Sequence, residues 1–199
     1  MIFYIMGKSA VGKDHIYEAL LRDETLHLQP VVLYTTRPPR AGETDGVEYH
    51  FTDEQHLEEL LREDKVIEYR VYNTVYGPWY YFTADEGQLH PAEQDYLGIG
   101  TPESCVKLRE HFGEACVCPV YIESDDGLRL ERSLKRERKQ KEPKYEEMCR
   151  RFLADQVDFS DERLRKAGIV RRFLNNGTLE DCIAEAAAYI RETRREEDR

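Results

Sequence analysis

The chain has 199 residues, of which 40% are hydrophobic and 35% charged, and its formal net charge is −11 at pH 7. This length and composition predict a single globular domain with a sizeable core and exclude a disordered chain. The longest apolar runs, residues 2–6 and 31–34, are far too short to span a bilayer, and the negative charge argues against a general binder of nucleic acid or of anionic membranes.

The N-terminal residues and the cysteines favour the same cellular compartment. A glycine loop begins at residue 7, with no basic leader or small-residue cleavage site before it, so we expect no signal peptide. The five cysteines form no CxxC pair and no His/Cys cluster at zinc spacing, which favours small buried side chains in a reducing environment. We expect a cytoplasmic protein, and the sequence leaves open whether it is a monomer or a homodimer.

Five short apolar segments are typical of buried strands, and helical patterns separate them. Apolar strands that alternate with helices pair in parallel through crossover connections, so we expect a three-layer α/β domain. In chain order the expected strands are residues 2–6, 31–34, 96–99, 117–122 and 169–174; the expected helices begin at residue 13 and then span 102–112, 128–139, 145–157 and 178–194.

Residues 36–82 interrupt this alternation and predict an insertion. They begin in "TTRPPRAGETDG", a loop dense in Pro and Gly, and continue with the expected strand "VEYHF". An amphipathic helix, "DEQHLEELLRED", and an aromatic-rich β region, "KVIEYRVYNTVYGPWYYF", follow. We expect this insertion to be antiparallel.

The segment "GKSAVGKD" lies between the first expected strand and the first expected helix. Backbone N–H groups of such a loop and the positive end of the following helix converge on an anion, as in loops that bind nucleotide phosphates. Lys13 can reach the outer phosphates of ATP. Such loops usually carry Ser or Thr next, whereas Asp14 offers a carboxylate, which is also a good ligand for Mg²⁺. The candidate ATP-binding residues are therefore Gly7, Lys8, Ser9, Ala10, Val11, Gly12, Lys13 and Asp14, with Asp14 as the candidate metal ligand.

Two further segments carry a resemblance to a known family. "YTTRPPRAGETDGVEYHF", followed by "VIEYRVYNTVYG", resembles the nucleotide-monophosphate-binding region of guanylate kinases, whose pattern is T-T-R-x-P-R-x-G-E-x-[DN]-G-x-x-Y-x-F. With the phosphate loop, a charged segment and a C-terminal asparagine, the resemblance covers nearly the whole chain. It implies a P-loop kinase fold with a five-stranded parallel sheet and one domain over 1–199. The implied parts are a core (1–35, 83–127 and 158–199), a small mixed β/α monophosphate-binding insertion (36–82) and a helical lid (128–157).

The resemblance assigns five residues to a GMP acceptor, and their chemistry suits it. Arg37 and Arg40 offer fork-shaped donors for a phosphate dianion. Tyr49 and Tyr76 can add phenolic hydrogen bonds to the same phosphate. Glu68 can accept two bonds from guanine N1–H and the 2-amino group, which adenine does not offer. Taken alone, the arginines would be explained as solvated loop charges and Glu68 as a surface strand residue.

The segment "LERSLKRERKQKEPKYEEMCRRF" lies where the resemblance implies a lid over the triphosphate. Arginines in such a lid stabilise charge on the transferring phosphoryl group. Most charges between 135 and 141 are better explained as a solvated helix face. Asn175 lies where the family has an adenine-side ATP contact, and a plain Asn-Asn-Gly turn explains it equally well. The candidate catalytic residues are Lys13, Arg37, Arg132, Arg136 and Arg151, with Arg150 as a further lid candidate.

Four positions depart from the family pattern. Leu33 replaces a serine that helps to hold the base, and Pro78 stands where a Ser or Thr is usual. Gly98 and Gly100 replace the two aspartates of an L-D-I-D strand that assist Mg²⁺ and guanine recognition. We hypothesise that Asp14 compensates by supplying a metal-side carboxylate from the loop.

The expected function is transfer of the γ-phosphoryl group of Mg-ATP to GMP or dGMP, catalysed by positioning and charge neutralisation. An alternative keeps the fold but changes the acceptor. Ribose 1,5-bisphosphate phosphokinase also resembles the chain at "GKD", at the strand without aspartates and at "LNN-G", but it lacks most of the acceptor motif. A third possibility is a catalytically silent binding module, which Lys13 and the intact glycine loop argue against.

Overall fold

Five parallel strands form the central sheet. The computed structural model describes residues 1–40, 42–74 and 77–197, with side chains described to residue 195. Every pairing in the central sheet is parallel, which confirms the five-stranded parallel sheet expected from the sequence. In spatial order the strands are β2 (Gln29–Pro30), β7 (Tyr96–Gly100), β1 (Ile2–Met6), β8 (Val117–Glu123) and β9 (Arg172–Leu174).

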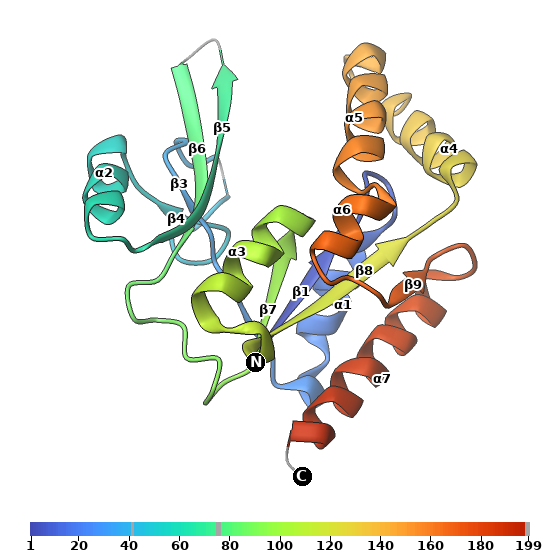
Figure 1. The fold of residues 1–199 in the computed structure, drawn as a ribbon. Coiled ribbons are helices and arrows are strands. Elements are labelled where there is room, and N and C mark those ends of the chain that lie inside the picture. Colours follow the sequence, from blue (N-terminus) through green and yellow to red (C-terminus); the bar gives the residue numbers. More distant parts are fainter. Residues whose placement is uncertain (41, 75–76, 198–199) are drawn as a thin grey trace.

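Helices cover both faces of this sheet (Figure 1). One helix pair packs on the face that carries Phe3 and Ile5, and another pair packs on the face that carries Ile2 and Tyr4. Because β1 is central and buried along its whole length, the domain has the three layers expected for an α/β fold. The first pair is α1 (Lys13–Arg22) and α7 (Leu179–Glu197), and the second is α3 (Pro102–Phe112) and α6 (Asp161–Lys166). Two short 3₁₀ turns, η1 (Glu24–Leu26) and η2 (Glu114–Cys116), precede β2 and β8.

A smaller mixed sheet stands beyond the carboxyl ends of the central strands. Its spatial order is β4 (His50–Phe51), β3 (Tyr34–Thr35), β6 (Gly77–Ala84) and β5 (Val66–Thr74). The long β5–β6 pair is antiparallel, whereas β3 and β4 are parallel. Helix α2 (Glu54–Arg62) packs Leu57 and Leu60 against Phe82 on one face of this sheet. Residues that alternate with Phe82 along β6 are therefore available on the opposite face.

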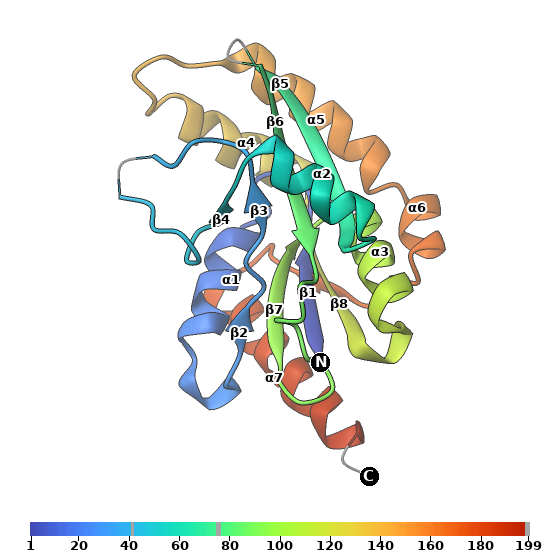
Figure 2. The same cartoon turned by 90° about the vertical axis from the view of Figure 1, so that its left-hand side faces the viewer.

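Two helices rise on the other side of the molecule. Figures 1 and 2 show α4 (Asp126–Glu137) and α5 (Tyr145–Asp158) as a pair that faces the small sheet across the ends of the central strands. Both helices lie within two residues of the bounds expected from the sequence. Over the described residues, no helix is both long and apolar enough to cross a membrane.

Three of the expected strands are wrong in their extent, and one of them, 169–174, is reduced to Arg172–Leu174. The apolar run 31–34 predicts one strand, but the chain passes here from one sheet to the other. The Val31 N–H still donates to Leu97 of the central sheet, whereas the Leu33 carbonyl accepts from His50 of the small sheet. The expected strand "VEYHF" is reduced to His50–Phe51, because the residues before it form a turn. Helix α6 has no counterpart among the expected helices, since six residues are too few for a clear periodic pattern.

Candidate active site

The phosphate loop connects β1 to α1 and leaves backbone donors open. Gly7 packs so closely on β8 that a Cβ there would lie 2.5 Å from the Ile122 carbonyl oxygen. Gly12 has φ +91° and caps α1 without any side-chain hydrogen bond. The first N–H groups of α1 are therefore free to bind an anion at the positive end of the helix.

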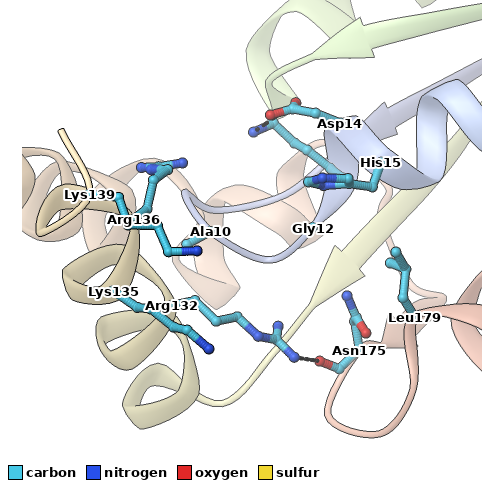
Figure 3. A pocket seen from close by; sticks show the side chains of 11 residues that line it. Ala10, Gly12, Asp14, His15, Arg132, Lys135, Arg136, Lys139, Asn175 and Leu179 are labelled. Atoms are coloured by element: carbon cyan, nitrogen blue, oxygen red, sulfur yellow. Dashed lines mark hydrogen bonds and ion pairs between the residues drawn. The ribbon is translucent and has the colours of Figure 1, made fainter.

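A pocket of about 470 Å³ opens beside this loop (Figure 3). In Figure 3 the cationic side chains from α4 and the residues just after it lie on one side, and Asp14, His15 and Asn175 lie on the other. Five cations and a single carboxylate line the pocket, so it suits a polyanion such as a nucleotide triphosphate. The lining residues are Ala10, Gly12, Lys13, Asp14, His15, Arg132, Lys135, Arg136, Lys139, Asn175 and Leu179.

The candidate lid arginines are not all gathered in this pocket. Arg132 and Arg136 line it together with Lys13. Arg151 lines a separate, smaller pocket of about 140 Å³ together with Arg136, and its Nη2 lies 3.5 Å from the Ser9 hydroxyl oxygen. Arg150 instead makes an exposed fork with Glu147, with both hydrogen bonds at 2.7 Å. The structure thus brings two of the four together at the site.

Asn175 supports the phosphate loop. Its buried Nδ2 donates to the Val11 carbonyl oxygen at 2.7 Å, and its own carbonyl oxygen accepts from Arg132 at 3.1 Å (Figure 3). The Asn175 Oδ1 atom has no hydrogen-bond partner among the residues that the structure describes. Asn175 therefore links the loop, through its side chain, to the candidate lid residue Arg132, through its backbone carbonyl oxygen.

Asp14 is the one carboxylate of the pocket, and its side chain is 71% exposed. It lies 3.6 Å from the Lys13 ammonium nitrogen. Within the described part of the chain, no three His, Cys, Asp or Glu side chains are grouped so that they could hold a metal ion by themselves. This donor set fits Mg²⁺ that is bound mainly by nucleotide phosphates, with Asp14 as a single protein ligand.

The candidate acceptor residues lie on the small sheet. Arg37 is 3% exposed and its guanidinium forms a fork with Glu43, at 3.0 Å and 2.8 Å. The pKa of Arg37 is raised because Glu43 accepts these bonds, and the pKa of the Glu43 carboxyl is correspondingly lowered. Tyr49 lies against the guanidinium, with 5.5 Å from Arg37 Cζ to the ring centroid, and Arg40 is exposed. Tyr76 lies outside the described residues.

Glu68 lies on the face of β5 that is turned away from α2. Its Oε1 accepts a hydrogen bond from Thr83 at 2.9 Å, and burial raises the pKa of the carboxyl. Glu68 does not share a pocket with the arginines: Arg37 and Arg40 line one of about 570 Å³, and Glu68 lines another of about 320 Å³. Tyr81 connects the two regions, since it pairs with Arg70 on β5, two residues after Glu68, and its ring lies 5.6 Å from that of Tyr49.

Comparisons with known proteins agree with this arrangement. A family model described as guanylate kinase matches residues 2–191. The chain belongs to the guanylate kinase family. Among curated guanylate kinases, that of Oceanobacillus iheyensis is 31% identical over 131 residues, covering 65% of this chain and 61% of the relative. That of Bacillus cereus is 36% identical over 116 residues, covering 57% and 55%. That of Schizosaccharomyces pombe is 40% identical over 74 residues, covering 37% of each chain. The matched segments thus span between about a third and three fifths of these guanylate kinases.

A solved structure gives the same fold at lower sequence similarity. The crystal structure of guanylate kinase from Anaplasma phagocytophilum matches with a TM-score of 0.56 and 19% identity. The match covers 98% of this chain and 85% of that chain. It shows that the guanylate kinase fold extends over nearly all of the present chain.

The departure of this family member at Gly98 and Gly100 has a steric cause. A Cβ at Gly98 would lie 2.5 Å from the Tyr4 ring, and a Cβ at Gly100 would lie 2.1 Å from the Tyr4 hydroxyl oxygen. Tyr4 is fully buried and donates a hydrogen bond to Ser104 at 2.9 Å. Burial is also the main reason why the pKa of Tyr4 is raised well above its ordinary value. Tyr4 therefore occupies the space that the two aspartate side chains of the family pattern would need.

The sequence did not reveal a buried arginine in the first turn of α4, in the candidate lid. Arg129 is fully buried and donates to the Ser9 carbonyl oxygen at 3.0 Å and to Asp155 at 2.7 Å. The same Asp155 carboxylate accepts from the Ser9 N–H at 2.7 Å, so α4, α5 and the loop share one network. Lys8 joins it through Gln156 Oε1 at 2.7 Å. No sequence signal distinguishes Arg129, because α4 carries cations on several sides.

Proposed function

We propose that this member of the guanylate kinase family transfers the γ-phosphoryl group of ATP to GMP or dGMP, with ADP and GDP or dGDP as products. The observation that carries the proposal is the pocket beside the phosphate loop, where Lys13 and the lid cations Arg132 and Arg136 surround the free N-terminus of α1. Such a site neutralises charge on a triphosphate, which is the main catalytic device in phosphoryl transfer.

The acceptor phosphate is itself the nucleophile, so the chain needs to position it rather than to activate it. In this proposal residues 36–82 bind the acceptor and residues 128–157 act as the lid. Arg40 receives the acceptor phosphate, and Arg37, which Glu43 holds in place, directs its charge toward the same position. Asp14 would hold Mg²⁺ beside the nucleotide phosphates, where the ion would neutralise part of their charge. Closure of the lid and the insertion would exclude water and so prevent hydrolysis of ATP.

A second acceptor is favoured by one observation. Tyr4 leaves no room for the strand aspartates, and a sugar phosphate needs no partner for a guanine base. This alternative predicts turnover of ribose 1,5-bisphosphate with no preference for guanine nucleotides.

The test is ADP release from Mg-ATP with GMP, dGMP, AMP, UMP, CMP and ribose 1,5-bisphosphate as separate acceptors. Turnover confined to GMP and dGMP, abolished by Lys13→Ala, is the expected result. Turnover with the sugar phosphate alone would replace the proposal by the second acceptor. Binding of ATP or GMP without any turnover would favour a silent binding module.

A further inference from the structure

Arg70 connects the small sheet to the central domain beside Glu68. It lies two residues after Glu68 on β5, so both side chains are on the same face of the strand. Its Nη2 atom donates to Thr101 Oγ1 at 2.8 Å and to Ser104 Oγ at 3.0 Å, at the cap of α3. Ser104 also accepts the Tyr4 hydrogen bond, so this chain of contacts crosses the space beside Gly100.

The Arg70 guanidinium is anchored through Nη2 but still has N–H groups that can donate to a ligand in the neighbouring pocket. Arg70 and Glu68 both line the 320 Å³ pocket, and Arg70 Nε lies 3.7 Å from Glu68 Oε2. Nη1 of Arg70 has no hydrogen-bond partner among the described residues, and the side chain is 36% exposed. Glu68 uses Oε1 to accept from Thr83 and keeps further lone pairs. The pair thus presents an acceptor and a donor side by side.

Guanine matches such a pair. Its N1–H and 2-amino group donate, and its adjacent C6 carbonyl oxygen accepts, whereas adenine has an amino group at C6 and an unprotonated N1. No donor for a base oxygen comes from the side chains of Leu33, which is apolar, or of Pro78, which also lacks a backbone N–H. Two cations, Arg70 and Lys107, line the pocket of Glu68. Lys107 is paired with Glu110 at 2.7 Å, whereas Arg70 Nε lies 3.7 Å from Glu68, so Arg70 is the cation placed to donate to such an oxygen.

We propose that Arg70 is a specificity-determining residue that donates to the C6 oxygen of guanine while Glu68 accepts from N1–H and the 2-amino group. The inference rests on the proposed function and adds to it the residue that selects a 6-oxopurine. Anchoring through Thr101 and Ser104 limits the rotamers of Arg70, so less entropy is lost when it binds the base.

A purely structural role for Arg70 would give a different result from base recognition. If Arg70 only held the small sheet against α3, its substitution would weaken the binding of all acceptors by the same factor. The experiment measures equilibrium binding of GMP and of 6-thio-GMP, in which sulfur, a weaker acceptor, replaces the C6 oxygen while N1–H and the 2-amino group remain. The variants are Arg70→Met, Arg70→Lys and Glu68→Gln, with Arg62→Met as a matched control on the exposed side of α2. Thermal unfolding of each variant reports whether it folds.

We expect Arg70→Met to weaken GMP binding roughly 10- to 100-fold, as for loss of a charge-assisted hydrogen bond, and to weaken 6-thio-GMP binding much less. Arg70→Lys should restore part of the preference, Glu68→Gln should weaken both ligands, and Arg62→Met should change neither. An unchanged ratio of the two dissociation constants in Arg70→Met would overturn the inference, and continued GMP turnover would leave the proposed function intact. Binding of ribose 1,5-bisphosphate but not of GMP by the unmodified protein would overturn both.

Discussion

Alanine at Gly100 should destabilise the protein because Tyr4 already fills the space above it. The added Cβ would lie 2.1 Å from the Tyr4 hydroxyl oxygen and 2.7 Å from Ser104 Oγ, and both side chains are buried. Overpacking of this kind costs about 1–3 kcal/mol. Displacing the hydroxyl would also remove the Tyr4–Ser104 hydrogen bond, which contributes about 1 kcal/mol. The φ of Gly100 is not positive, so Ala does not strain the folded backbone. Because Ala lowers the conformational entropy of the unfolded chain, it offsets about 0.5 kcal/mol of this loss. The net loss should be about 2–3 kcal/mol.

Urea unfolding of a double-mutant cycle tests the cause of this loss. Tyr4→Val removes the ring and creates a cavity, at a cost of about 3 kcal/mol. If the clash is with the Tyr4 side chain, whose hydroxyl lies nearest, Gly100→Ala should cost much less in the Tyr4→Val background, which gives a coupling free energy of about 2 kcal/mol. Gly177→Ala is the matched control, because its φ is not positive and the nearest atom to its Cβ would be 3.9 Å away. That variant should keep the urea midpoint of the unmodified protein or exceed it slightly.

Additive losses in the cycle would contradict the steric explanation. In that case the glycines at 98 and 100 would not be explained by Tyr4, and the departure from the family pattern would need another cause. An unchanged midpoint in Gly100→Ala alone would have the same meaning, since it would show that Tyr4 moves aside at no cost.

Three further predictions concern the proposed catalytic site. Burial raises the pKa of Glu68 above the ordinary 4.5 of a glutamate. We therefore expect kcat/KM for GMP to fall as the pH decreases through this raised pKa, and we expect Glu68→Gln to remove that decrease. If the decrease persists in the variant, a group other than Glu68 causes it. Arg129→Met should lower the free energy of unfolding by about 3 kcal/mol. It removes a fully buried cation and leaves the Asp155 carboxylate, which is 15% exposed, without that partner. A loss below about 1 kcal/mol in urea unfolding would mean that water replaces the arginine. Asp14→Ala, which leaves no oxygen ligand at this position, should abolish Mg²⁺-dependent ADP release if Asp14 is the metal ligand, and unchanged turnover would refute that role.

The sequence predicts most of the central domain because its signals are local. All five residues of β1 are buried, so an apolar run followed by glycine is enough to identify the strand. The failure at residues 31–34 has a clear reason: an apolar run shows that a segment is buried, but not in which sheet. Val31 bonds to the central sheet and Leu33 to the small one, and only the long-range partners distinguish them.

In the candidate site, too, the sequence predicts local features but does not reveal partners that are distant along the chain. The phosphate loop is contiguous, so its glycines and Lys13 can be recognised by spacing alone. Arg129 contacts Ser9 across 120 positions of sequence, and Arg70 contacts Thr101 across 31. An arginine in a charged helix or in an aromatic strand gives no sign of these partners, because its role depends on which distant elements the fold brings beside it.

The replacement of the two family aspartates is therefore better understood as one linked change than as two separate losses. Tyr4 on β1 needs glycine at 98 and 100 on the neighbouring strand. The Tyr4 hydroxyl and the Arg70 guanidinium both donate hydrogen bonds to Ser104, so neutral and cationic groups lie where the family pattern has carboxylates. With no carboxylate at 98 or 100, the one carboxylate that lines the candidate ATP pocket comes from the loop side, at Asp14. The exchange of side-chain volume between β1 and β7 would thus alter both the proposed metal site and the proposed base site.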